Sequence, residues 1–220
     1  MNGLIIGGIV VFLGGIIAAA IFFSKKAIVK RALKKAPLMQ ISQFKGGEAG
    51  RITGKVAFVG QVLNAPLSNR RCSYYNVVVE EYRSSGKSGH WHTIINEEVA
   101  GDIVLAQGNQ YALIDKTAIK SYLLPDANFK SGTFNNATPE LEAFLAQRGY
   151  KSTGLIGLNK TLKYSEGVLE ENETFTVSGI GNWMTSKPAG VNIPASRFLL
   201  VTPGEKGVVY LTDDPKIAEA

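Results

Sequence analysis

A chain of 220 residues with 45% hydrophobic content has room for one membrane segment and one domain of about 150–200 residues, which excludes a large multidomain enzyme. Its formal net charge of +6 would suit a nucleic-acid partner only if the charge were spread over the domain. The excess comes instead from six cations that lie before Pro37, where there is no acidic residue: Lys25, Lys26, Lys30, Arg31, Lys34 and Lys35. The other 18 of the 24 Lys and Arg residues are balanced by 18 Asp and Glu residues. The domain is therefore neutral, and nucleic acid is not an expected partner.

The first 24 residues are predicted to form a transmembrane anchor. Residues 4–23 are uncharged, and a helix of this length spans a hydrocarbon core of about 30 Å. No basic residue precedes Lys25, whereas a cleaved signal peptide begins with a basic region. By the positive-inside rule, the cations after the helix place the N-terminus outside and the domain in the cytoplasm, as in a bacterial inner-membrane protein.

Two features near this end predict partners. The six cations are interleaved with apolar residues up to Pro37, so residues 25–37 are expected to form a basic juxtamembrane helix that binds the anionic headgroups of the lipid bilayer. Within the anchor, the spacing of Gly14 and Ala18, repeated one residue later, would let two helices approach closely as a homodimer. Gly and Ala are also common in membrane helices that do not associate, so both interpretations stay open.

Residues 40–215 are predicted to form a β-rich domain, mainly β within the α+β class, because short apolar runs alternate with Gly, Asn and Pro. The clearest strand covers residues 73–82, which alternate between two faces and are rich in β-branched and aromatic side chains. It should return through a polar loop at 84–89 into a second strand at 91–95. Further strands are expected at 51–61, 103–105, 111–114, 174–180, 198–201 and 208–211.

One helix should interrupt the strands, over residues 138–149. Thr138 suits the N-cap, a proline follows at the first helical position, and Gly149 suits the stop. The helix divides the domain into two candidate halves, 44–126 and 153–212, each with a short apolar strand that ends in Gly. The domain is therefore expected to form one or two small barrel-like halves.

A set of residues in the domain follows the order of a known family. The set comprises Gly60-Gln61-Val62, Pro66-Leu67-Ser68, Cys72-x-Tyr74-Tyr75, Val77 to Glu80, Trp91, Tyr164-x-Glu166, Leu169, Glu173 and Val177-x-Gly179. Over residues 44–211 the chain resembles the GIDE-type domain, also called the "beside a membrane" domain, of membrane-bound E3 ubiquitin ligases. The resemblance implies a short prokaryotic form of that domain. Its candidate interaction residues are Pro66, Leu67, Ser68, Cys72, Tyr74, Tyr75, Trp91, Glu166 and Gly179.

The zinc-binding RING module of those ligases is not expected here. It needs two zinc ions held by Cys and His side chains, and the chain has one Cys and two His in total. These three side chains do not complete even one four-ligand structural site. We therefore expect a RING-less protein with no ligase catalysis, no metal and no cofactor of its own.

Two further catalytic hypotheses concern the same three side chains. His90 and His92 lie on one face of a predicted strand and would form half of a metal site, or else a pair of surface histidines. Cys72 with one of these histidines would form a nucleophile and a base, or else Cys72 is a small core residue. No phosphate-binding glycine loop is present in the sequence.

The observations predict a membrane-anchored, β-rich interaction or scaffold module, held beside the bilayer and without its own catalytic site. A strand edge or an aromatic loop, such as residues 82–91, would bind an unknown protein partner. The alternative is a membrane or substrate-recognition component of a ubiquitin-like modification system whose catalysis another chain supplies. A Cys/His hydrolase is the third hypothesis.

Overall fold

The fold is built around a small closed barrel. In the computed structural model, which describes residues 23–86, 88–132, 136–154 and 157–218, five strands form a closed ring in the order β1-β6-β7-β12-β11. They are β1 (Glu48–Val56), β6 (Val104–Gln107), β7 (Gln110–Ile114), β12 (Phe198–Thr202) and β11 (Thr174–Met184). β7 and β12 pair in parallel, whereas the other neighbours, including the closing pair β1 and β11, are antiparallel. The predicted mainly β class is confirmed.

Strand β11 is long enough to pair with two different strands along one of its edges. Its residues 180–184 pair with β12, and its residues 176–178 pair with β13 (Val209–Thr212). Strand β8 (Ile119–Tyr122) then pairs in parallel with β13. These two strands extend the barrel wall on one side. Fully buried apolar side chains fill the barrel, among them Ile52, Leu105, Phe175, Val177 and Leu199.

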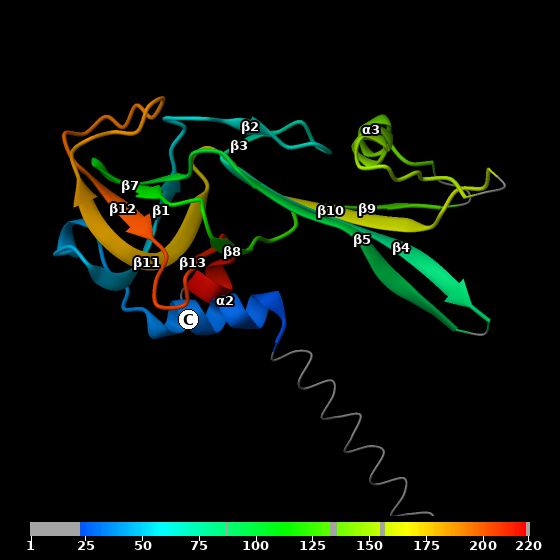
Figure 1. Cartoon of the computed structure of the whole chain (residues 1–220), viewed down its shortest axis with the longest axis horizontal. Helices are drawn as coiled ribbons and strands as arrows, with labels where there is room; N and C mark the ends of the chain where they lie inside the picture. The colour runs from blue at the N-terminus through cyan, green and yellow to red at the C-terminus, as the bar shows by residue number, and fades with distance from the viewer. Residues whose placement is uncertain (1–22, 87, 133–135, 155–156, 219–220) are drawn as a thin grey trace, which may run out of the picture.

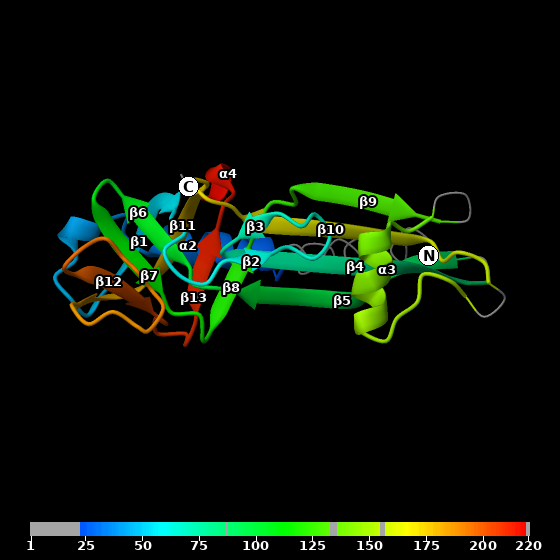
Figure 2. The same ribbon diagram turned by 90° about the horizontal axis from the view of Figure 1, so that it is seen from above.

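A long arm extends from the barrel (Figure 1). It is a four-stranded antiparallel sheet in the order β5-β4-β10-β9. Its strands are β4 (Tyr74–Ser85), β5 (Ser88–Ala100), β9 (Ala127–Ser131) and β10 (Leu162–Leu169). Helix α3 (Pro139–Gln147) crosses one face of this sheet (Figure 2) and packs Leu141, Phe144 and Leu145 against it. The shorter elements are η1 (Ile41–Gln43), β2 (Leu63–Asn64), β3 (Arg71–Cys72) and α4 (Pro215–Ala218).

The predicted hairpin is confirmed as β4 and β5, which are longer than expected and carry a bulge after Val79. The strand expected over residues 51–61 is shorter than predicted, because it ends at Val56. The chain then bends, and Gly60 lies so close to Asp102 that a Cβ would be 2.5 Å from a carboxylate oxygen. The glycine at the end of this segment thus marks a close approach and not the last residue of a strand.

The helix expected over residues 138–149 is confirmed as α3, and Thr138 caps it by accepting a hydrogen bond from the Leu141 N–H at 3.3 Å. The ranges 44–126 and 153–212 on either side of α3 contribute to one shared barrel in the described chain. β1, β6 and β7 come from the first range, and β11 and β12 come from the second. Three short strands alone would leave two open edges, and pairing them with strands of the other range removes both edges.

Helix α2 (Lys25–Lys35) lies under the barrel in Figure 1, beside β8, β13 and α4. It confirms the basic helix predicted before Pro37. The predicted anchor, residues 1–24, lies outside the described residues except for Phe23 and Ser24. Within the described part of the chain, no helix combines the length and the apolar character needed to cross a membrane.

Candidate functional site

Helix α2 is fixed to the barrel through one buried face. Val29 and Leu33 are four residues apart, hence on one side of the helix, and both are fully buried. They share one apolar cluster with Tyr210 of β13 and Ile217 of α4. Burying two such side chains contributes about 3–6 kcal/mol. Helix α2 is therefore part of the folded domain and not a loose linker.

Two cations at the start of α2 bind carboxylates of the domain. Lys26 Nζ lies 3.0 Å from an oxygen of the buried Asp214 carboxylate, and this hydrogen bond is the main cause of a raised pKa at Lys26. Lys25 forms an ion pair with Glu98 of β5. Two of the six cations predicted to contact lipid headgroups thus hold the helix on the protein itself.

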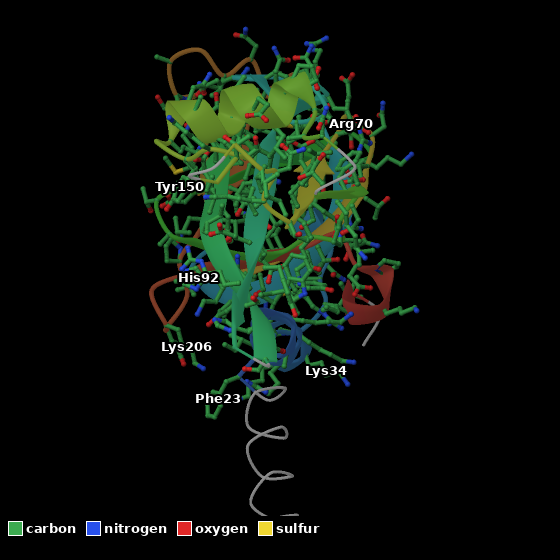
Figure 3. All side chains as sticks on the ribbon, turned by 90° about the vertical axis from the view of Figure 1, so that its right-hand side faces the viewer. Phe23, Lys34, Arg70, His92, Tyr150 and Lys206 are labelled. Atoms are coloured by element: carbon green, nitrogen blue, oxygen red, sulfur yellow. The ribbon has the colours of Figure 1, made fainter. Side chains whose placement is uncertain are left out.

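The six cations together form a basic collar, and the four that remain lie further along α2. Lys30 and Arg31 are partly buried, whereas Lys34 and Lys35 are exposed in the last turn, where the helix dipole favours positive charge. Figure 3 shows Lys34 projecting at the lower end of the molecule, beside α2. The part of α2 nearest its C-terminus is therefore the strongly cationic part of its exposed surface.

The ion pair of Lys25 and Glu98 belongs to a network at the junction of barrel and arm. Glu98 also accepts hydrogen bonds from the hydroxyl groups of Tyr74 and Ser121, the latter at 3.2 Å. Tyr74 is buried, its Oη lies 2.9 Å from Ser121 Oγ, and burial raises the pKa of Tyr74 to about 12. Helix α2 and strands β4, β5 and β8 meet at these four side chains. The direction of the arm is thereby fixed relative to α2.

The structure brings together four of the motif residues around a buried carboxylate. Glu166 is 1% exposed and accepts the backbone N–H groups of Leu67 and Ser68 at 2.8 and 3.0 Å. Pro66 precedes this turn, and the buried Cys72 pairs with Leu63 in the adjoining ribbon. A carboxylate that satisfies two buried N–H groups stabilises a turn. The role of this part of the motif is therefore structural.

Cys72 and the two histidines are not assembled into a catalytic pair. Burial, aided by the charges of Glu166 and Glu170, raises the pKa of the Cys72 thiol to about 11. His92 pairs across the sheet with Glu81. Cys72 lies beside the start of β4, and at the usual rise per residue Glu81 is about 20 Å further along this strand. Both histidines are exposed. Among the described residues, no group of three or more His, Cys, Asp or Glu side chains could hold a metal ion.

Tyr75 and Gly179 also have structural roles. The Tyr75 hydroxyl donates to Glu97 at 3.2 Å, and Arg148 binds the same carboxylate through two N–H groups at 2.5 and 2.6 Å. This contact with Arg148 lowers the pKa of Glu97 and ties the end of α3 to β5. At Gly179, a Cβ would lie 2.4 Å from the Thr202 carbonyl oxygen. Only glycine lets β11 approach β12 this closely.

The outer half of the β4–β5 hairpin presents two aromatic side chains. Trp91 faces Tyr82 across the strands in an edge-to-face contact with ring centroids 5.4 Å apart. They are 37% and 43% exposed, and Lys163 Nζ lies 4.5 Å from the Trp91 ring centroid. β5 is an edge strand of its sheet, and residues 88–93 are exposed. An exposed strand edge beside aromatic side chains suits the addition of an extended peptide segment.

Sequence reasoning missed Glu98 and Lys163. Glu98 is one of two adjacent glutamates, and Lys163 lies in a strand where polar and apolar residues alternate. In neither case do the neighbouring residues in the sequence indicate which side chain it contacts. Their contacts with Lys25 and Trp91 arise only when segments distant in the sequence are folded together.

Two exposed features of the described residues remain as the candidate site. They are the docked basic helix and the aromatic hairpin, and the network at Glu98 joins the helix to the base of the hairpin. Comparison of the chain with protein-family models, with curated proteins and with solved structures found no match in any of the three.

Proposed function

We propose that this chain is a membrane-anchored, β-rich interaction module that holds a recognition hairpin beside the bilayer and has no catalytic site of its own. The observation that carries the proposal is the rigid attachment of α2 to the domain. Val29 and Leu33 bury one face of the helix, and Lys25 pairs with Glu98 at the base of β5. A membrane segment that continues into α2 would therefore fix the position of the whole arm.

The direction of the arm supports recognition near the membrane surface. In Figure 1 the β4–β5 hairpin bends toward the lower side of the molecule and ends level with α2, although the two lie toward opposite ends of the long axis; Figure 3, viewed along that axis, shows both at the lower side. With α2 at the headgroups, the hairpin tip would lie close to the same plane. The partner proposed is an extended segment of another membrane-surface protein, which adds as a strand to β5 and contacts Trp91 and Tyr82. Confinement to one membrane raises the effective concentration of both proteins.

The topology proposed with this function has the N-terminus outside and the domain in the cytoplasm of a bacterial inner-membrane protein. It follows from the position of the cations after the predicted anchor. Self-association through the Gly and Ala stripe of the anchor, which lies outside the described residues, would add a second copy of the hairpin and strengthen binding by avidity.

The test compares partner capture by three forms of the full-length, tagged chain after cross-linking in intact membranes. These are the wild type, a double variant with Tyr82→Ala and Trp91→Ala, and a control with Tyr150→Ala. Tyr150 has a similar exposure, 38%, but lies outside the hairpin. We expect the wild type and the control to recover the same partner, and the hairpin variant to recover at least about tenfold less, as for loss of two aromatic contact residues.

Two results would contradict the proposal. Equal recovery by all three forms would exclude the hairpin as the recognition surface. If the chain recovers lipid but no protein other than those that an unrelated anchored domain also recovers, the chain is not an interaction module. A further control with the chain lacking residues 1–24 measures how far capture depends on the predicted anchor.

A second candidate is the recognition component of a ubiquitin-like modification system, as the motif resemblance implies. The residues Pro66, Leu67, Ser68 and Cys72 carry the most specific part of the resemblance, and they lie together around Glu166. This grouping favours a fold shared with that family, and the recognition role is proposed from the shared fold. In this case, the partner captured at the hairpin should carry a covalent protein modifier, and the modified fraction should fall when the chain is deleted. An unmodified partner would leave only the first candidate.

A further inference from the structure

A groove opens between α2 and the barrel wall. Its volume is about 670 Å³, which is within the range of pockets that hold small organic ligands. Apolar side chains line it from both sides: Phe23, Ile28 and Ala32 at the helix, and Val208 and Tyr210 at the barrel. Small residues make up much of the remaining lining, including Ala49, Gly50, Ser178, Gly179 and Gly204. The groove therefore combines open space with an apolar surface.

The same groove is lined by four cations and a single carboxylate, that of Glu205. The cations are Arg31 and Lys35 of α2, Lys120 of β8 and Lys206 in the turn before β13. The charge of Lys120 also acts on Lys25, whose pKa is lowered by burial and then by this like charge. Positive charge beside apolar surface is complementary to an anionic amphiphile.

The groove lies at the end of the molecule that the proposed function places against the bilayer. Phe23, which lines the groove and is 68% exposed, is the last residue of the uncharged stretch that is predicted to cross the membrane. Figure 3 shows Phe23, Lys34 and Lys206 at this same lower end of the molecule. Lipid would therefore be the most concentrated anionic ligand at the mouth of the groove.

From this arrangement we infer that the groove binds one anionic phospholipid of the surrounding bilayer. The phosphate lies among the cations, and the upper part of an acyl chain lies along Ile28, Ala32 and Val208. The inference rests on the proposed membrane placement and adds a defined lipid site to it. It differs from attraction by a basic collar, because Lys120 and Lys206 belong to the barrel and complete the site only after folding.

The test uses the full chain, purified from membranes in detergent, with a photoreactive phosphatidylglycerol as the probe. A double variant with Lys120→Gln and Lys206→Gln should be labelled about 25-fold less, since each cation near an anionic lipid changes binding by about fivefold. The matched control, Lys30→Gln with Lys34→Gln, removes two cations of α2 that do not line the groove. Its labelling should change by less than about threefold.

Several outcomes would overturn the lipid site. Equal loss of labelling in the two double variants would indicate diffuse attraction to the collar, and no loss in either would exclude the groove cations from binding. A photoreactive phosphatidylcholine should label the wild type at least about tenfold less than the anionic probe. Equal labelling by the two lipids would show that the groove does not recognise negative charge.

Unfolding of a variant would also reduce its labelling. A variant that is expected to bind more lipid separates the two causes, because unfolding would not increase labelling. Glu205→Gln removes the single carboxylate of the lining and should raise labelling by the anionic probe about two- to fivefold; unchanged or lower labelling would count against the site. The membrane placement is checked separately by washing membranes with carbonate. Release of the wild-type chain would overturn both proposals, whereas retention with unaltered labelling of the groove variants would overturn only the lipid site.

Discussion

The barrel end and the arm of this molecule differ in how they use their surfaces. At the barrel end, five strands close on one another and α2 covers part of the wall with Val29 and Leu33, so that strand edges and apolar residues are buried. The arm is an open sheet whose edge strand β5 begins with six exposed residues, 88–93. The difference indicates that the barrel end supplies stability and fixed orientation, while the outer arm leaves a strand edge exposed, which is the surface that the proposed function uses.

The largest effect is expected from a substitution in the docked face of α2. Leu33→Ala removes a fully buried side chain and should lower the unfolding free energy by about 2–5 kcal/mol, because lost burial and an unfilled cavity add together. Leu38→Ala is the matched control, since Leu38 is 60% exposed; its effect should stay within about 0.5 kcal/mol. Urea unfolding of the detergent-solubilised chain measures both. Similar small effects of the two variants would mean that α2 is not held by the barrel.

The next effect concerns the base of the arm, where Cys72 is as well buried as the barrel core. With a thiol pKa of about 11, the thiolate fraction at pH 8 is about 100-fold lower than for a thiol with the ordinary pKa of 9.0. Alkylation of the folded chain by iodoacetamide should therefore be about 100-fold slower than alkylation in urea, and faster as the pH rises toward 11. Equally rapid labelling in both states would revive the hydrolase hypothesis.

A smaller effect is expected at Asp213, near the junction of barrel and arm. Burial, together with the charge of Glu173, raises the pKa of this carboxyl from 3.8 to about 7, although it accepts the Leu124 N–H at 2.8 Å. Between these two pH values the folded state binds more protons than the unfolded state, so the unfolding free energy contributed by Asp213 falls as the pH rises from about 4 to 7.

Asp213→Asn keeps the acceptor oxygen for Leu124 and removes the titration. The variant should gain stability relative to the wild type between pH 5 and pH 8, with the difference becoming level above the folded-state pKa of about 7. Urea midpoints measured across this range provide the test. Parallel curves for the two proteins would show that Asp213 is ionised in the folded state at both ends of the range.

Elements with a local signal could be predicted from the sequence. The hairpin of β4 and β5 was predicted from two-residue alternation, and α3 from Thr138 as its cap. The basic helix was predicted up to Pro37, but the burial of Val29 and Leu33 against the barrel was not, because the apolar residues of α2 also fit a helix lying on a membrane. The two faces of α2 can be distinguished only when Tyr210 and Ile217 are in place.

Long-range pairing and the groove had no local signal. The parallel pairs of β7 with β12 and of β8 with β13 join segments that lie on opposite sides of α3 in the sequence. Lys120 and Lys206 are ordinary surface cations in the sequence, and they line a groove with Arg31 and Lys35 only after those strands pair. Of the motif residues, Glu166 was expected at an interaction surface, whereas its two backbone hydrogen bonds make it part of the support of the fold.

The smallest effect on stability is expected from Trp91→Ala in the outer arm. The substitution removes an edge-to-face contact with Tyr82 and a cation contact with Lys163, interactions that contribute about 1 kcal/mol each at partly exposed positions. Trp91 is 37% exposed, so the unfolding free energy should fall by about 1–2 kcal/mol, as measured by urea unfolding. Capture of a membrane partner should fall far more.

A loss of stability as large as that of Leu33→Ala would mean that the aromatic pair is part of a packed core, and the arm would then resemble the barrel end. A stable variant that no longer captures its partner would separate the region that holds the fold together from the region that binds.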